Sequence, residues 1–106
     1  NGKILVNNGR EVMQLYSYKY ELKLNLYNNI DNTFGIKKEL IDFCINNKIQ
    51  YILVETGHYN MNILSSDWLG TDLLSEFNKG DFKPFSLIER FDHGVNALLL
   101  LQVPNI

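Results

Sequence analysis

The sequence of 106 residues is short of the features that mark several large classes of protein. It has a single cysteine, Cys44, and so cannot form an internal disulfide bond. Its longest apolar run, residues 97–101, is far too short to cross a membrane, and no signal peptide is visible. Its many asparagines form no Asn-x-Ser/Thr glycosylation sequon. We therefore expect a cytoplasmic protein that does not contact a membrane.

Motifs for cofactor binding are missing as well. The seven glycines stand alone, so there is no glycine-rich phosphate loop, and Gly-x-Ser-x-Gly does not occur. No His-x-Glu or Cys-x-x-Cys pattern supports a zinc site. The net charge is −2 and the lysines and arginines are scattered, which argues against a passive nucleic-acid-binding module. We expect no cofactor.

The composition is that of an ordinary folded domain. Hydrophobic residues make up 45% of the chain and charged residues 21%, and this length supports a core without disulfides or metals. We expect one domain over residues 1–106. A start at Asn1 rather than Met is consistent with a fragment of a longer protein.

A helix followed by a buried strand organises the middle of the chain. Apolar residues between 36 and 44 recur at i, i+4, i+7 and i+8, which predicts a helix over residues 34–47 with Cys44 on its buried face. Residues 31–33 offer N-caps, and Asn46 or Asn47 suits the left-handed position that closes a helix. The run from Gln50 to Glu55 is apolar at its centre and predicts an interior strand.

The N-terminal part predicts a hairpin. Asn8-Gly9 lies between apolar runs and favours a tight turn, which joins a strand at Lys3–Val6 to a long one at 11–27. Alternation of apolar and polar residues from Tyr20 to Tyr27 supports that second strand.

The C-terminal half predicts a second helix and two more strands. Leu69, Leu73 and Phe77 share one helical face, with an N-cap within 65–67. Gly70 weakens this helix, and Gly80 ends it. Residues 85–91 and 95–103 read as strands, with a short helix at 86–89 as the alternative. The whole is an α+β, α/β-like domain of order β-β-α-β-α-β-β, a mixed sheet with one or two helices packed on it.

Glu21-Leu22-Lys23 carries the most specific chemical hypothesis. Residues two apart on a strand project from the same face, so the carboxylate and the ammonium lie side by side. With the helix and strand that follow, this segment resembles the PD-(D/E)xK nuclease superfamily. That resemblance implies Mg²⁺ or Mn²⁺ held by Glu21, catalysis by Lys23, and DNA or RNA as substrate. No acidic residue precedes Glu11, whereas the family has one on an earlier strand. The alternative is an ordinary solvated strand face.

Histidines and aromatic residues supply the other candidates. His58 follows the central strand and, with Glu55 close by, could serve as an acid, a base or a metal ligand. Tyr27, Tyr59 and Trp68 together would make an exposed protein-binding patch, unless they form the edges of the core.

The sequence therefore favours a small interaction or regulatory domain that binds a protein partner, or associates with itself, through an exposed strand edge or this aromatic patch. A metal-dependent nuclease-like domain, active or not, is the alternative.

Overall fold

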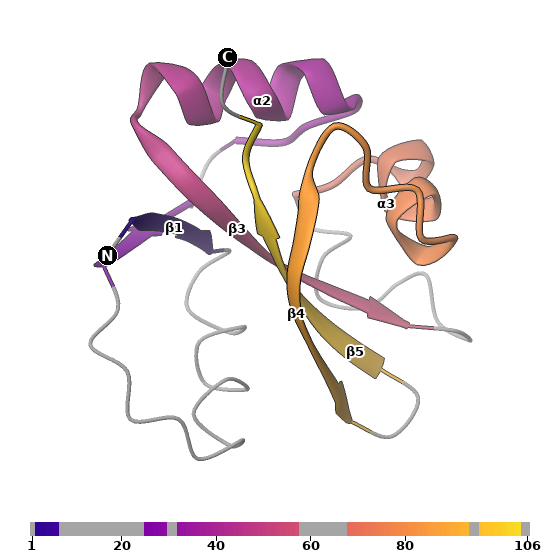
Figure 1. Cartoon of the computed structure of the whole chain (residues 1–106). Coiled ribbons are helices and arrows are strands. Elements are labelled where there is room, and N and C mark those ends of the chain that lie inside the picture. The colour runs from indigo at the N-terminus through magenta and orange to yellow at the C-terminus, as the bar shows by residue number, and fades with distance from the viewer. Residues whose placement is uncertain (1, 7–24, 30–31, 58–67, 94–95, 105–106) are drawn as a thin grey trace.

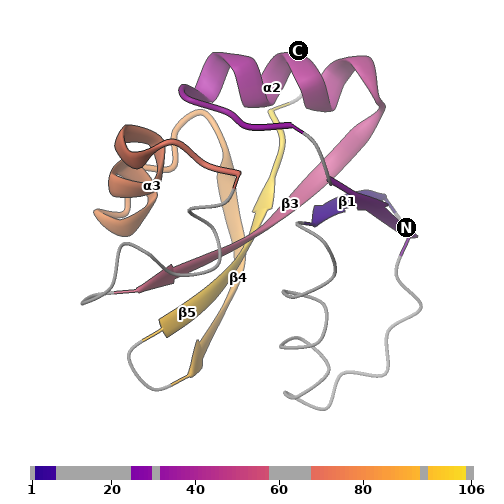
Figure 2. The same cartoon turned by 180° about the vertical axis from the view of Figure 1, so that it is seen from behind.

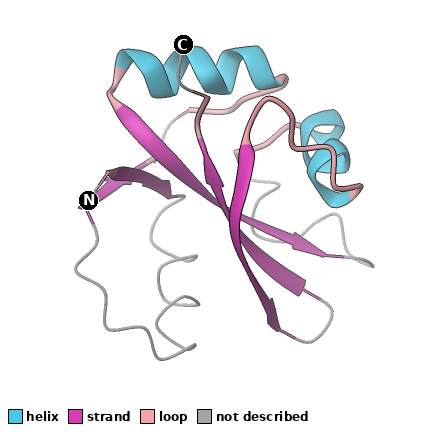
Figure 3. Cartoon of the chain, in the orientation of Figure 1, coloured by secondary structure: helices cyan, strands magenta, loops and turns pink. Residues whose placement is uncertain are grey.

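The computed structural model describes residues 2–6, 25–29, 32–57, 68–93 and 96–104, and these contain five strands and two helices (Figure 3). Their order is the β-β-α-β-α-β-β order that the sequence predicts, and the α+β class is confirmed. The elements are β1 (Lys3–Val6), β2 (Asn25–Asn28), α2 (Lys37–Asn46), β3 (Ile49–Gly57), α3 (Thr71–Asn78), β4 (Ser86–His93) and β5 (Asn96–Gln102).

The strands form one mixed sheet in the order β2-β1-β3-β5-β4 (Figure 1). β1 is parallel to both of its neighbours, β2 and β3, whereas β5 is antiparallel to both β3 and β4. β3 is therefore the central strand, as predicted for residues 50–55. Ile52, Leu53 and Val54 are all buried, which explains why this strand is apolar on both faces.

Each face of the sheet has its own apolar cluster. Ile52 and Val54 pack in the larger cluster together with buried side chains of α2 and α3. Leu53 points to the opposite face and belongs to a smaller cluster with Ile4, Val6, Phe91 and Leu98. Figure 2 shows the two helices and the sheet from behind.

α2 buries Leu40, Ile41 and Cys44, which confirms the predicted burial of the thiol. The helix begins at Lys37, too late for residues 31–33 to cap it. Instead, the Glu39 carboxylate accepts hydrogen bonds from the backbone N–H groups of Gly35 (2.8 Å) and Ile36 (3.2 Å). The Ile36 N–H is the N-cap group that a capping box satisfies, and the Gly35 N–H lies one residue before it.

The end of α2 differs from the prediction by one residue. Asn47 donates both its backbone N–H (3.1 Å) and its side-chain amide (2.8 Å) to the carbonyl of Phe43. Lys48 then takes the left-handed conformation with φ 57°. The prediction that Asn46 or Asn47 would occupy this position is wrong, because Asn47 is held as the cap and the chain reverses after it.

The predicted pairing of the N-terminal strands is wrong. A hairpin makes its two strands antiparallel, but β1 and β2 are parallel, with Ile4 opposite Leu26. Asn8-Gly9 and residues 11–24 lie outside the described residues, so only the last part of the predicted second strand, β2, can be compared. Parallel neighbours need a crossover connection and cannot be joined by a two-residue turn.

The start of α3 also differs from the prediction. Residues 68–70 are not helical because they pair with Phe34, whose N–H donates to the Trp68 carbonyl at 2.8 Å and whose carbonyl accepts the Gly70 N–H at 2.7 Å. Gly70 is the N-cap of α3 rather than a weak point within it, so residues 65–67 are not the cap. A Cβ at Gly70 would lie 3.1 Å from the Gly35 Cα, which explains the glycine. Gly80, with φ 83°, ends the helix as predicted.

β4 and β5 form the C-terminal hairpin in the predicted place, so the short helix at 86–89 does not form. The pairing register shifts between Leu87 and Glu89, which makes Ile88 a bulge.

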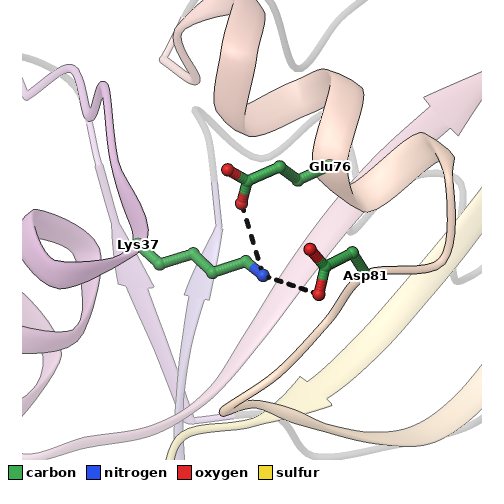
Figure 4. Close-up of polar contacts among 3 residues, drawn as sticks. All are labelled: Lys37, Glu76 and Asp81. Carbon is green, nitrogen blue, oxygen red and sulfur yellow. Dashed lines mark ion pairs between the residues drawn. The ribbon is translucent and has the colours of Figure 1, made fainter.

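A charged contact joins the two helices (Figure 4). The Lys37 ammonium at the start of α2 lies 3.3 Å from the Glu76 carboxylate and 3.2 Å from that of Asp81. The Lys37 side chain is only 15% exposed. Because no basic residue occupies the last turn of α3, Lys37 provides the positive charge that a helix C-terminus favours.

Candidate functional site

Four of the sequence-predicted site residues, Glu21, Lys23, His58 and Tyr59, lie outside the described residues. The catalytic and metal-binding hypotheses therefore stay predictions. In the ranges that the structure describes, no group of three or more His, Cys, Asp or Glu side chains is arranged to hold a metal ion. No helix of these ranges is long and apolar enough to cross a membrane.

Trp68 does not belong to an exposed patch. Its side chain is 1% exposed and packs edge to face against Phe34, with the ring centroids 6.1 Å apart. The hydrogen bonds between Phe34 and residues 68–70 fix this position. The expectation that Trp68 contacts a partner is thus corrected, because its indole is part of the core.

Tyr27 is half-buried in a cluster that closes the end of α2. The Phe43 ring packs edge to face against it at 5.7 Å, and the Lys3 ammonium lies 5.5 Å from its ring centroid. Lys3 also donates a hydrogen bond to the Asn47 carbonyl at 3.0 Å, which places a positive charge at the helix C-terminus. The hydroxyl of Tyr27 lies 3.4 Å from the Asn47 side-chain oxygen. These contacts give Tyr27 a structural role.

Glu55 lies near the carboxyl end of β3 and is fully buried. It faces the same side of the sheet as Leu53, because residues two apart on a strand share a face. The parallel strands β1, β2 and β3 all have their carboxyl ends at this edge of the sheet. Open α/β sheets place their ligands at such an edge, so Glu55 lies where a ligand of this kind of sheet would be expected.

A hollow of about 520 Å³ opens where α2 ends and β3 begins. It forms because Lys48 reverses the chain directly into β3, while the segment after β5 is held at this end of the sheet by a hydrogen bond from the Val103 N–H to the Gln50 carbonyl (2.8 Å). Buried Cys44, Ile49 and Val103 line its floor, and exposed Lys48, Gln50 and Gln102 line its rim. Its remaining lining residues are Ile45, Tyr51 and Pro104.

The Cys44 thiol is an apolar part of this floor. Burial raises its pKa from the ordinary value of 9.0 to about 12. Because the thiolate is the nucleophilic form, a thiol with this pKa stays protonated and unreactive near neutral pH. The hollow therefore offers shape, apolar surface and hydrogen-bonding groups rather than covalent chemistry.

One exposed apolar side chain lines the hollow, and two more lie on β4, the strand next to β5. Among the described residues, the large exposed hydrophobic side chains are Ile36, Ile45, Leu87 and Ile88, each between 43% and 56% exposed. Ile45 lines the hollow, and Leu87 follows Ser86, which pairs with the lining residue Gln102. We call Ile45, Lys48, Gln50, Leu87, Ile88 and Gln102 the sheet-end surface.

Sequence reasoning missed this surface because it searched for aromatic residues on strand faces. The available signal was an isoleucine off the buried face of the helix and a Leu-Ile pair followed by charged residues at 89 and 90.

No family of proteins matches the chain, and neither the curated proteins nor the solved structures contain a match.

Proposed function

We propose that this chain is a small regulatory domain that binds another protein at the sheet-end surface. The observation that carries the proposal is the hollow with exposed Ile45 in its lining, together with exposed Leu87 and Ile88 on the edge strand β4. Protein interfaces commonly combine an apolar centre with a polar rim, and this hollow has buried apolar residues on its floor and exposed polar residues on its rim. An apolar side chain of the partner would occupy the hollow above Cys44 and Val103.

The charge of the rim favours a partner segment with an acidic residue next to its apolar anchor. Among the described residues that line the hollow, Lys48 is the one that carries a charge, and it is exposed. Gln50 and Gln102 can donate or accept hydrogen bonds on either side of the anchor. Contacts at a rim of this kind determine orientation more than affinity, so the apolar side chains are the ones to test.

The test compares three variants of the immobilised chain. Ile45→Gln and Leu87→Thr remove apolar area from the sheet-end surface, whereas Ile36→Gln removes it from the other end of α2. A protein retained by the wild type is purified, and its affinity is measured by calorimetry. We expect Ile45→Gln to weaken binding at least about tenfold, Leu87→Thr to weaken it less, and Ile36→Gln to leave it unchanged. A partner whose affinity is the same for all four chains would refute the proposal.

A metal-dependent nuclease activity is a separate, second proposal. It is supported by Glu21-Leu22-Lys23 and by the strand, helix and strand, β2, α2 and β3, that follow this motif. The assay is cleavage of labelled single- and double-stranded DNA and RNA with Mn²⁺ by the wild type and by Lys23→Ala. Cleavage that the variant loses supports the activity, and no cleavage, or equal cleavage by both chains, removes it.

A further inference from the structure

β4 is an edge strand of eight residues. It ends the strand order, and within the described part of the chain it pairs only with β5. An edge strand presents backbone N–H and C=O groups that can pair with a strand from another chain. Its side chains from Ser86 to Arg90 and that of Asp92 are exposed.

The bulge at Ile88 divides β4 into two parts. Leu87 before it belongs to the sheet-end surface, whereas Glu89 to His93 form a regular run in which each residue pairs with one residue of β5. Only this second part has the straight register that a further antiparallel strand needs.

The charges of this run select one way of pairing with a second copy. Around a two-fold axis perpendicular to the sheet, the residue on the axis faces itself, and its two neighbours face each other across the strands. An axis at Glu89, Arg90 or Asp92 would oppose two like charges. An axis at Phe91 opposes two aromatic rings and places Arg90 of each copy opposite Asp92 of the other.

We propose that β4 pairs with β4 of a second copy of this chain, antiparallel, with Phe91 on the two-fold axis. Arg90 and Asp92 already lie on one face of the strand, with the Arg90 Nε 2.9 Å from an Asp92 carboxylate oxygen. Dimerisation brings two such pairs together, so that four charges of alternating sign form one network. An isolated exposed ion pair contributes little, and a network contributes more.

This inference does not depend on the proposed function. It uses residues 89–92, whereas partner binding uses the sheet-end surface, whose β4 residues are Leu87 and Ile88. The competing explanation is that the bulge and the charges only prevent edge pairing, which natural sheets do by the same means. That explanation predicts a monomer whose association state none of the substitutions below changes.

The decisive experiment is a charge exchange followed by analytical ultracentrifugation of the full chain. The wild type is expected to form dimers that dissociate on dilution. Arg90→Asp alone and Asp92→Arg alone each oppose like charges, and each should raise the dissociation constant of the dimer at least about tenfold. An equimolar mixture of these two variants restores opposite charges at both pairs, so it should form heterodimers.

The mixture distinguishes an effect on dimerisation from an effect on folding. Each variant has lost its own pair of opposite charges at positions 90 and 92, so only the other variant can supply the opposite charges. Lys38→Asp is the matched control for Arg90→Asp, because it makes the same change in net charge on α2, where Lys38 pairs with Asp42 at 2.7 Å. It should dimerise like the wild type. A wild type that is monomeric at about 0.5 mM, or variants that do not associate when mixed, would overturn the proposal.

Discussion

At the scale of single residues, burial decides the chemistry of Cys44. The thiol lies in the core under the hollow, and burial raises its pKa to about 12. In the unfolded chain the pKa returns to its ordinary value of 9.0. Between these two values the folded protein binds more protons at Cys44 than the unfolded protein does, so the contribution of this thiol to stability falls as the pH rises.

We therefore expect the wild type to lose stability faster than Cys44→Ala as the pH rises from about 9 to about 12. The difference between the two free energies of unfolding should change by up to about 1.4 kcal/mol per pH unit, since one proton is involved. Urea unfolding of both chains at several pH values measures this difference, in which the titrations common to both chains cancel. A difference that is constant over this range would show that Cys44 ionises as easily in the folded protein as in the unfolded one.

Burial of single aromatic residues was the least predictable feature of the candidate site. Trp68 and Tyr27 were expected at the surface on the basis of local pattern, yet Trp68 is in the core. Its position depends on hydrogen bonds with Phe34, far away in the chain, and no local periodicity reveals such a pairing. The exposed Ile45 could not be recognised as part of a surface either, because the hollow beside it is formed by segments from three parts of the chain.

At the scale of elements, the Lys37 contact positions α3 against α2. Lys37 is largely buried between two acidic side chains, whereas its neighbour Lys38 is 79% exposed and pairs with one acidic residue, Asp42, in the described part of the chain. A charge that is partly removed from water and has two partners is worth more than an exposed pair, which contributes about 0–1 kcal/mol. The two adjacent lysines thus form a matched comparison.

Lys37→Met should lower the free energy of unfolding by about 1–2 kcal/mol, and Lys38→Met should lower it much less. Methionine keeps most of the apolar part of the lysine side chain. The decrease in the free energy of unfolding at position 37 therefore measures the effect of removing the ammonium group and leaving the two acidic side chains without it. Thermal or urea unfolding measures both variants. Equal losses for the two variants would mean that the contact between the helices adds nothing to stability.

Elements with a clear period or a clear boundary residue were predictable, and their partners were not. α2, β3 and the β4–β5 hairpin follow from apolar periodicity, and Gly80 ends α3 where it was expected. The pairing of β1 with β2 was wrong because the sequence shows apolar runs but not whether two strands run in the same direction. Gly70 looked like a weak point within a helix, although it allows close contact with Gly35 before the helix begins.

At the scale of the whole molecule, the bulge at Ile88 separates two surfaces with different chemistry. The sheet-end surface is apolar with a polar rim, and the run from Glu89 to Asp92 is charged and self-complementary. A dimer formed through β4 carries two copies of the sheet-end surface. If the partner is itself a dimer, both surfaces can be occupied at once, which raises the apparent affinity without any new contact.

Dimerisation also predicts how heat unfolds the protein. Anything that binds the folded chain and not the unfolded chain stabilises it by mass action, and here the ligand is a second copy. The melting temperature of the wild type should therefore rise with protein concentration, whereas that of Arg90→Asp should stay nearly constant over the same range. Differential scanning calorimetry over a hundredfold range of concentration checks this. The equimolar mixture of Arg90→Asp and Asp92→Arg should recover the concentration dependence, since its heterodimers dissociate on unfolding. A melting temperature that is independent of concentration in all of these samples would leave the folded monomer as the stable unit and β4 as an edge that the bulge and charges protect.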